Sequence, residues 1–166
     1  MMFFGTVYVD LDGVLVDFYR GAEKVLGHPF HHFDKDEMSK KDRNIILGTH
    51  ETFWKDLPPM PNWWNLWKIL RKYEPHVLTA VPHWDDRYVY KGKRHWVKQY
   101  LHVDPKRVHI VFRHEKQDYA KSGSTQNLLI DDSPKNIDEF VKAGGLGILH
   151  KDIPSTTRTL QDFGIT

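Results

Sequence analysis

The sequence predicts an α/β protein built on a parallel sheet of about five strands. Two observations support this fold class. Short runs of aliphatic and β-branched residues alternate along the chain with segments of helical periodicity, an order typical of β-α-β units with right-handed crossovers. Polar residues directly follow several of these runs, as expected where strands end at the ligand-binding edge of an open sheet. With 166 residues, the chain is long enough to form one domain with a buried core.

The first expected strand is Val7-Tyr8-Val9, which leads into Asp10-Leu11-Asp12-Gly13. β-branched and aromatic residues favour a buried strand, and an acidic pair before glycine is typical of a strand that ends at a turn. The apolar residues that follow predict a helix from Phe18 to Leu26. Gly27-His28-Pro29 is expected to stop this helix.

Residues 28–60 have a different composition, rich in His, Lys, Asp and aromatic residues, with a helical piece near 34–47. We interpret residues from about 19 to 60 as a small helical cap inserted after the first strand, within a single domain of residues 1–166. His28, His31 and His32 are interpreted as solvated or structural side chains. The reason is that no acidic or histidine partner stands at a recognised metal-ligand spacing.

The remaining elements follow in regular alternation. A helix is expected to begin near Pro61, since proline is favourable in a first turn, and its core-facing stripe has apolar residues at spacings of three and four. That stripe is Trp63, Leu66, Trp67 and Leu70, with Trp64 half exposed beside it. Further strands are expected at 76–80, 107–112, 127–132 and 146–150, and further helices at 88–101 and 137–143. Leu160 and Phe163 have helical spacing in the tail.

The composition excludes several classes of protein. There is no cysteine, which excludes disulfides and cysteine-ligated zinc and favours a reducing, cytoplasmic location. No apolar run approaches the roughly 20 residues of a membrane span, and the N-terminus lacks the charged start of a signal peptide. The net charge of +2 is too small to imply nucleic-acid binding. The segment from Arg87 to Lys121 is nevertheless basic, with ten Lys or Arg and three Asp or Glu residues, which suits an anionic substrate.

Polar residues at four strand ends form the candidate site. They are Asp10 and Asp12, Thr79, Lys116, and Asp131 and Asp132. The carboxyl ends of parallel strands share one edge of the sheet, so these side chains are expected to converge. Carboxylates that meet in this way require a cation, and oxygen ligands alone favour Mg²⁺. A threonine and a lysine beside the metal would bind an anion, and the whole set suits phosphoryl transfer.

These motifs resemble those of the haloacid dehalogenase-like (HAD) phosphohydrolases, and most closely those of the 5'(3')-deoxyribonucleotidases. The matching segments are Val9-Asp10-x-Asp12-Gly13-Val14-Leu15-x-Asp17-Phe18, Phe53 with Trp54-Lys55-Asp56-Leu57-Pro58-Pro59-Met60-Pro61, Lys93-x-x-Trp96-Val97 and Leu128-Leu129-Ile130-Asp131-Asp132. The resemblance spans roughly residues 6 to 150. It implies a three-layer Rossmann-like HAD fold and a Mg²⁺-dependent phosphomonoesterase that acts through an aspartyl-phosphate intermediate.

The resemblance also implies catalytic roles. Asp10 would be the nucleophile, and Asp12 would act as general acid and then as general base. Mg²⁺ would be held by Asp10, by Asp12 through its backbone carbonyl, and by Asp132, with Asp131 in support. Lys116 would pair with the phosphate and with the nucleophile.

Other residues would bind the substrate. The resemblance implies that Thr79 and Ala80 contact the phosphate and that Phe18 packs on the substrate base. Lys93 and Arg113 would assist in binding.

The chain departs from the subfamily pattern at two motifs. The phosphate loop, usually Thr-Ser-Pro, reads Thr79-Ala80-Val81-Pro82, which removes one hydroxyl group. The usual Arg-Asp-Lys reads Arg113-His114-Glu115-Lys116 and is one residue longer, so Lys121 is an alternative to Lys116. We prefer Lys116 because it lies closer to the end of the third expected strand.

The leading functional prediction is a phosphatase for (deoxy)ribonucleoside monophosphates. The short cap leaves another small phosphate ester open as the substrate, and the basic segment 87–121 leaves a polynucleotide-end phosphatase open. A non-catalytic phosphate-binding module is disfavoured, because a pure binder has no need of both Asp10 and Asp12. We therefore expect a small-molecule phosphate ester as partner, no membrane and no stable nucleic-acid partner, with a homodimer left open.

Overall fold

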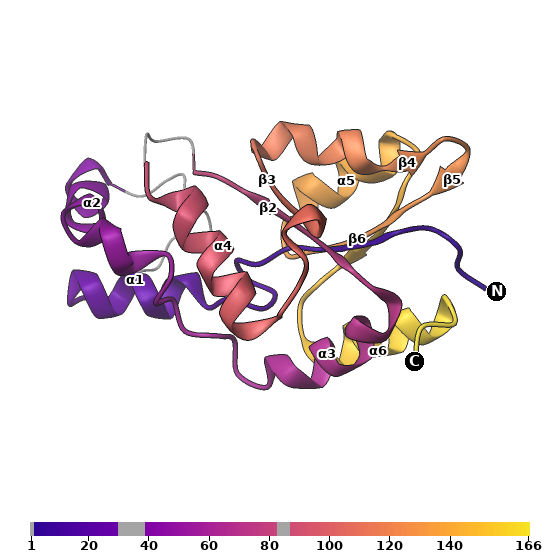
Figure 1. Ribbon diagram of the computed structural model, residues 1–166, viewed down its shortest axis with the longest axis horizontal. Helices are drawn as coiled ribbons and strands as arrows, with labels where there is room; N and C mark the ends of the chain where they lie inside the picture. Colours follow the sequence, from indigo (N-terminus) through magenta and orange to yellow (C-terminus); the bar gives the residue numbers. More distant parts are fainter. Residues whose placement is uncertain (1, 30–38, 83–86) are drawn as a thin grey trace.

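The computed structural model describes residues 2–29, 39–82 and 87–166 (Figure 1). His31, His32 and the first part of the helical piece expected near 34–47 lie outside these residues. Within them, the parallel sheet has five strands: β1 (Val7–Val9), β2 (His76–Ala80), β3 (Val108–Val111), β6 (Leu128–Asp131) and β7 (Leu146–Leu149). The strand order is β3-β2-β1-β6-β7, and every pairing is parallel. The fold class predicted from the sequence is confirmed.

β1 is the central strand, and its residues are buried because both faces of the sheet are covered. Val9 pairs with Val77 of β2 on one side and with Ile130 of β6 on the other. This register brings the ends of the three strands to the same edge. It therefore places Asp10, Thr79 and Asp131 next to one another.

Helices cover both faces of the sheet, giving three layers. α3 (Trp63–Leu70), α4 (Val89–Tyr100) and α6 (Ile153–Asp162) bury Leu66, Trp96 and Leu160 in the larger apolar cluster on one face. α5 (Pro134–Lys142) buries Phe140 in the smaller cluster on the other face. Figure 1 shows α3 and α6 together on one side of the sheet and α5 on the opposite side.

Short 3₁₀ helices and a hairpin connect these elements. The 3₁₀ helices are η2 (Arg71–Tyr73), η3 (Pro105–Arg107) and η4 (Arg113–Tyr119). β4 (Lys121–Ser122) and β5 (Thr125–Gln126) are two very short strands that form an antiparallel hairpin. η4 was not expected from the sequence, and it carries Lys116.

Local signals account for where two helices near the site begin. α1 (Phe18–Leu26) begins after Asp17, whose carboxylate accepts a hydrogen bond from the amide of Arg20, and ends at Gly27 with φ 72°. α5 begins at Pro134, three residues before the expected start at 137. Its N-cap Ser133 accepts a hydrogen bond from the amide of Asn136, and proline fits the first helical position.

α1 and α2 (Lys40–Phe53) lie beyond the carboxyl ends of the strands, at the left of Figure 1. Two close approaches attach this part of the chain to the rest. Gly21 of α1 lies against Leu57, and Gly92 of α4 lies against Trp54, in both cases with too little room for a Cβ atom. Among the described residues, no helix combines the length and the apolar composition that a membrane span requires.

Candidate active site

The segment after β1 turns sharply and carries two carboxylates. The amide of Asp10 donates to the carbonyl of Ile130, which extends the β1–β6 pairing to the edge of the sheet. The amides of Val14, Leu15 and Val16 all donate to the carbonyl of Leu11, which closes a tight turn. This turn fixes Asp10 and Asp12 relative to β1.

Gly13 is required within this turn for two reasons. Its φ of +84° is a conformation that residues with a Cβ atom adopt with strain. A Cβ atom at this position would also lie 1.9 Å from Oδ2 of Asp132. The absence of a side chain at Gly13 therefore lets the Asp132 carboxylate approach the first turn.

Lys116 joins two of the predicted carboxylates. Its Nζ lies 3.1 Å from Oδ1 of Asp10 and 2.6 Å from Oδ2 of Asp131. Burial alone would lower the pKa of this lysine, but the charges of Asp10 and Asp131 and the hydrogen bonds to them raise it above its ordinary value. Lys116 is therefore a charged group at neutral pH, although its side chain is almost completely buried.

Asp131 is fully buried and its oxygens are used within the protein. Besides Lys116, it accepts hydrogen bonds from the amide of Ser133 at 2.9 Å and from Nδ2 of Asn136 at 3.2 Å to each carboxylate oxygen. These donors surround the carboxylate. Asp131 thus orients Lys116 and the start of α5, which agrees with a supporting role beside a metal.

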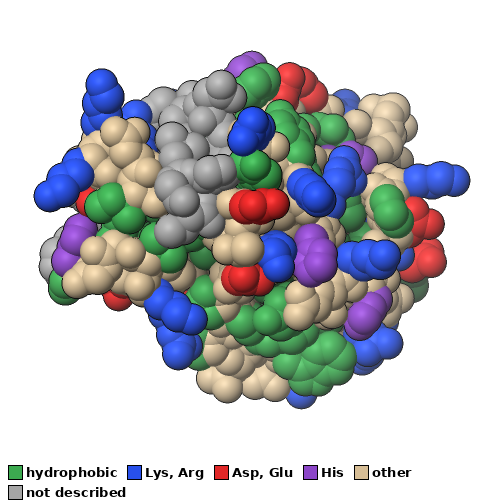
Figure 2. Space-filling view, turned by 60° about the vertical axis from the view of Figure 1, so that its left-hand side comes forward, with side chains coloured by type: hydrophobic (Ala, Val, Ile, Leu, Met, Phe, Trp, Pro, Cys, Tyr) green, Lys and Arg blue, Asp and Glu red, His purple; other side chains and the backbone are tan. Residues whose placement is uncertain are grey.

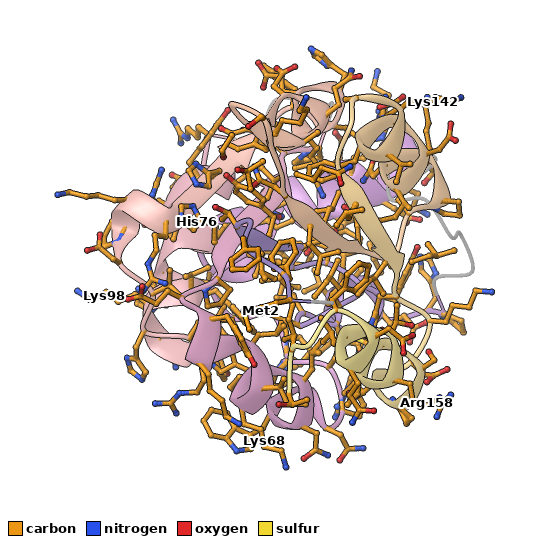
Figure 3. The ribbon with its side chains drawn as sticks, turned by 90° about the vertical axis from the view of Figure 1, so that its right-hand side faces the viewer. Met2, Lys68, His76, Lys98, Lys142 and Arg158 are labelled. Atoms are coloured by element: carbon orange, nitrogen blue, oxygen red, sulfur yellow. The ribbon has the colours of Figure 1, made fainter. Side chains whose placement is uncertain are left out.

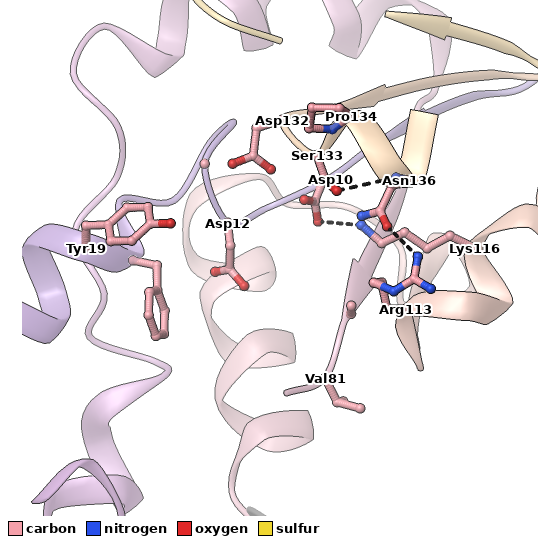
Figure 4. A pocket seen from close by; sticks show the side chains of 13 residues that line it. Asp10, Asp12, Tyr19, Val81, Arg113, Lys116, Asp132, Ser133, Pro134 and Asn136 are labelled. Atoms are coloured by element: carbon pink, nitrogen blue, oxygen red, sulfur yellow. Dashed lines mark hydrogen bonds and ion pairs between the residues drawn. The ribbon is translucent and has the colours of Figure 1, made fainter. Parts of the chain in front are cut away.

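Asp132 has no such partners. Its carboxylate makes no hydrogen bond or ion pair that involves a described residue, and it faces the space beside Asp10 and Asp12 (Figure 4). The residue as a whole is exposed, yet desolvation of the carboxyl group in the cavity, followed by the charges of Asp10, Asp131 and Asp12, raises the pKa of Asp132 to about 8. A bound cation would remove this repulsion.

The carboxylates fit a magnesium ion. Ligand oxygens of Asp10, Asp131 and Asp132 lie within 4.8 Å of one another. The cluster consists of oxygen donors only, which suits a hard divalent cation. Because the oxygens of Asp131 are already hydrogen-bonded, Asp10 and Asp132 are the carboxylates best placed to hold the ion.

Lys93 on α4 forms a second buried ion pair at the site. Its Nζ lies 2.8 Å from Oδ2 of Asp12 and 2.8 Å from Oγ1 of Thr79, and it lies 5.3 Å from the ring centroid of Trp54. Thr79 is fully buried, and its hydroxyl oxygen accepts the hydrogen bond from Lys93. Lys93 therefore links the predicted acid–base residue to the strand end of β2 and to the segment that follows α2.

A cavity of about 540 Å³ opens beside these groups. Asp10, Asp12, Lys116 and Asp132 line one wall, and the ring of Tyr19 on α1 lies across from them (Figure 4). Phe18, the neighbour of Tyr19 on α1, also lines the cavity. The rest of the lining consists of Gly13, Ala80, Val81, Arg113, Ser133, Pro134 and Asn136. Phe18 is almost completely buried and packs against Phe53 and Trp54. Its ring therefore supports the apolar wall and exposes little surface to the cavity.

Arg113 lies at the cavity but is held by α5. Its guanidinium donates to Oδ1 of Asn136 at 3.1 Å and to both carboxylate oxygens of Glu139, at 2.8 and 3.2 Å. The hydrogen bond from Arg113 lowers the pKa of the Glu139 carboxyl group. This arrangement ties Arg113 to the same asparagine that orients Asp131.

The structure brings most of the residues predicted from the sequence together and distinguishes the two candidate lysines. Lys121 is exposed on β4 and its side chain lies over Gly144, whereas Lys116 lies between the carboxylates. Tyr19, Val81 and Asn136 were not predicted. Of these, only Asn136 had a local signal, because Ser133-Pro134 is a helix start that would place it in the first turn.

Known proteins resemble this chain in fold and in sequence. No protein-family model matches the chain. A hydrolase from Streptococcus pneumoniae TIGR4 superposes with a TM-score of 0.54 at 12% identity, covering 96% of this chain and 100% of that one. A protein of Vibrio phage KVP40 named "Putative 5'(3')-deoxyribonucleotidase" is 27% identical over 134 residues, covering 78% of this chain and 67% of the phage protein.

The chain therefore shares its fold with a solved hydrolase and is similar in sequence to a protein named as a deoxyribonucleotidase, in agreement with the resemblance stated from the sequence. A HAD family enzyme from Bacteroides thetaiotaomicron, solved in complex with magnesium and inorganic phosphate, superposes with a TM-score of 0.47 at 15% identity, covering 89% of this chain and 94% of that one.

Proposed function

We propose that the protein is a Mg²⁺-dependent phosphatase that removes phosphate from a (deoxy)ribonucleoside monophosphate. The observation that carries the proposal is the Asp10–Lys116–Asp131 arrangement beside the carboxylate of Asp132, which pairs with none of the described residues. A nucleophilic carboxylate, a buried cation and a metal-binding carboxylate at one cavity are the groups that phosphoryl transfer requires. The phage relative, by its name, supports a nucleotide as the substrate.

In the first step, a carboxylate oxygen of Asp10 attacks the phosphorus atom. The bond to the leaving oxygen breaks while the bond to Asp10 forms, and Asp12 donates a proton to the leaving oxygen. Water then attacks the aspartyl phosphate. Asp12 takes a proton from this water, and the Asp10 carboxylate is restored when inorganic phosphate leaves.

The surrounding cations support these steps. Lys116 would pair with a phosphate oxygen and keep the Asp10 carboxylate in place, since Nζ of Lys116 already lies 3.1 Å from Oδ1 of Asp10. Lys93 would hold the Asp12 carboxylate toward the cavity through the contact of 2.8 Å. Mg²⁺, bound by Asp10, Asp132 and the backbone carbonyl of Asp12 with Asp131 in support, would neutralise charge on the phosphate oxygens.

The leaving group would occupy the part of the cavity farthest from the carboxylates. We propose that residues 19–60, with α1 and α2, act as a small cap and that Phe18 and Tyr19 form the wall against which a nucleobase packs. Ala80 would supply a backbone contact to phosphate in place of the missing hydroxyl. Thr79 and Arg113 would act through Lys93 and Asn136, the residues that they contact.

Replacing the nucleophile tests the proposal. Asp10→Asn should abolish phosphate release from deoxyribonucleoside monophosphates, because an amide oxygen cannot form the covalent intermediate, while the thermal unfolding temperature should stay near that of the wild type. Chelation of Mg²⁺ should remove the activity of the wild type, and added Mg²⁺ should restore it. Near wild-type turnover by Asp10→Asn would show that the nucleophile is assigned wrongly.

The same assay distinguishes the remaining substrate class. A panel of phosphorylated sugars and other metabolites at equal concentration should be hydrolysed more slowly than nucleotides. Equal turnover across the panel, without a preference for any base, would favour a phosphatase for another small phosphate ester.

A further inference from the structure

α4 presents a basic face on a different side of the helix from Lys93. Lys93 on one side of this helix reaches Asp12, whereas Lys91, Arg94 and Lys98 are exposed on another side. Their spacings of three and four residues align these side chains in a single row along the helix. The sequence of α4, VYKGKRHWVKQY, contains no acidic residue.

The row has the dimensions of a short segment of nucleic acid. Lys98 lies seven positions after Lys91, which corresponds to about 10 Å along a helix. Stacked nucleotides in a strand rise about 3.4 Å each, so the row spans about three phosphates. Arg87 extends the row toward the N-terminal end of α4, where its guanidinium lies 4.9 Å from the ring centroid of Tyr88.

Exposed aromatic rings accompany the cations. Tyr90 on α4 and Trp64 on α3 are each 45% exposed. Trp64 contacts Trp63, whose ring packs edge-on against Tyr100 at the C-terminal end of α4. The guanidinium of Arg71 lies 5.6 Å from the Trp64 ring, so a further cation flanks this position. Cations alternating with exposed aromatic rings are typical of surfaces that bind single-stranded nucleic acid.

The N-terminal half of α4 lies beside the catalytic site, because Lys93 reaches Asp12. α4 follows β2, whose last residue Ala80 lines the cavity, so the N-terminal end of the helix lies at the catalytic edge of the sheet. Figure 2 shows Lys, Arg and His side chains spread over one face of the molecule, among hydrophobic and a few acidic side chains. Glu51 on α2 lines a groove together with Lys91 and His95, so its negative charge lies beside the row.

We propose that the exposed face of α4, with Trp64 beside its C-terminal end, binds single-stranded nucleic acid and guides a phosphorylated end into the cavity. A strand fits better than an anionic membrane, because the apolar side of α4, with Val89, Trp96 and Val97, is buried in the core and unable to enter lipid. The guiding step rests on the proposed phosphatase function. Binding to the α4 face does not.

Binding is tested first with an unphosphorylated, fluorescently labelled oligonucleotide of eight thymidines, using fluorescence anisotropy. The wild type should bind it, and its log Kd should rise with log salt concentration with a slope of about 2, as three released counterions predict. The triple variant Lys91→Glu, Arg94→Glu, Lys98→Glu should bind at least ten times more weakly. Glu51→Lys should bind more tightly than the wild type.

The matched control carries the same charge change elsewhere. Lys142, Lys151 and Arg158 are exposed, and Figure 3 shows Lys142 and Arg158 on the side of the molecule opposite Lys98. Lys142→Glu, Lys151→Glu, Arg158→Glu should leave Kd within twofold. Absence of binding by the wild type, or equal weakening in both triple variants, would overturn the proposal. So would binding that depends on the α4 row with phosphatidylserine vesicles but not with the oligonucleotide.

The guiding step is tested by comparing two substrates. The ratio of kcat/KM for the 5'-phosphorylated oligonucleotide to kcat/KM for the corresponding mononucleotide should fall at least tenfold in the α4 triple variant and should not change in the control. An unchanged ratio in the α4 variant would refute guiding. If the wild type hydrolyses neither substrate, the phosphatase proposal fails, and the anisotropy experiment still decides whether α4 binds the strand.

Discussion

Lys116 and Lys121 are five residues apart but have different surroundings. Lys116 is buried between Asp10 and Asp131, whereas Lys121 is exposed on β4. Lys116→Met removes the only counter-charge that the described residues supply to Asp131, and we expect it to lower kcat by about 10²–10³-fold. Phosphate release measured at saturating Mg²⁺ checks this expectation.

Lys121→Met is the matched control for that experiment, since it removes the same charge from an exposed position. Its kcat should stay within twofold of the wild type. A larger loss in Lys121→Met than in Lys116→Met would assign the motif lysine to position 121.

Asp132 should destabilise the metal-free protein at neutral pH. Its pKa is raised to about 8 in the folded state, so folding disfavours the ionised form, and this destabilisation grows as pH rises from about 4 to 8. Asp132→Asn should therefore raise the Tm of the metal-free protein at pH 7.5, by about 2–4 °C if about 1 kcal/mol is recovered.

The same variant should lose most of the stabilisation that Mg²⁺ confers on the wild type, because a neutral amide is a poorer ligand for a hard cation. Differential scanning fluorimetry with and without Mg²⁺ at pH 4.5 and pH 7.5 separates the two effects. An equal gain in Tm at both pH values would contradict the electrostatic explanation.

At the scale of single elements, the turn between β1 and α1 decides how the carboxylates proposed to bind the metal meet. Gly13 has φ +84° and would place a Cβ atom 1.9 Å from Oδ2 of Asp132. Gly13→Ala should therefore displace Asp132, raise the Mg²⁺ concentration needed for half-maximal activity by about tenfold or more, and lower stability. A magnesium titration of activity measures the first effect.

Gly123 in the β4–β5 turn offers a control with similar backbone conformation. Its φ is +61°, and a Cβ atom there would meet no atom within 4 Å. Gly123→Ala should lower stability by about 1 kcal/mol through backbone strain alone and leave the Mg²⁺ requirement unchanged. If both alanine variants changed the Mg²⁺ requirement equally, the contact between Gly13 and Asp132 would not be its cause.

At the scale of the whole molecule, a histidine pair between β2 and β3 should make the free energy of unfolding depend on pH. His76 and His109 stack at 5.2 Å, and Nδ1 of His76 lies 2.9 Å from Nε2 of His109. Burial lowers the pKa of both, assisted by His109 and Arg107 at His76 and by Arg94 at His109. The unfolded chain therefore takes up protons near pH 6.5 that the folded protein does not, and stability falls as pH drops below that value.

The measured Tm should decrease between pH 7.5 and pH 5.5 by roughly 2–4 °C more in the wild type than in His109→Gln, which removes one titrating group. His95→Gln, at an exposed position on α4, serves as the control and should keep the wild-type difference. A difference in Tm that His109→Gln leaves unchanged would exclude this pair as its source.

Much of the fold could be predicted from the sequence because its signals are local. The five strand runs, the helix from Phe18 to Leu26 and its end at Gly27 follow from side-chain periodicity and from residues that favour one backbone conformation. The short 3₁₀ helix η4 was missed. Its residues, RHEKQDY, carry no apolar repeat that would distinguish a helical turn from a loop.

By itself, the sequence determined the fold class, the chain order of the strand-end motifs and the chemical character of the site. Only the tertiary structure decided that Lys116 rather than Lys121 meets the carboxylates, that Lys93 pairs with Asp12, and that the remaining cations of α4 form a separate face. The physical reason is distance along the chain. Periodicity reports how neighbouring residues share a face, whereas a contact between residues 81 or 106 positions apart depends on strand register and helix packing.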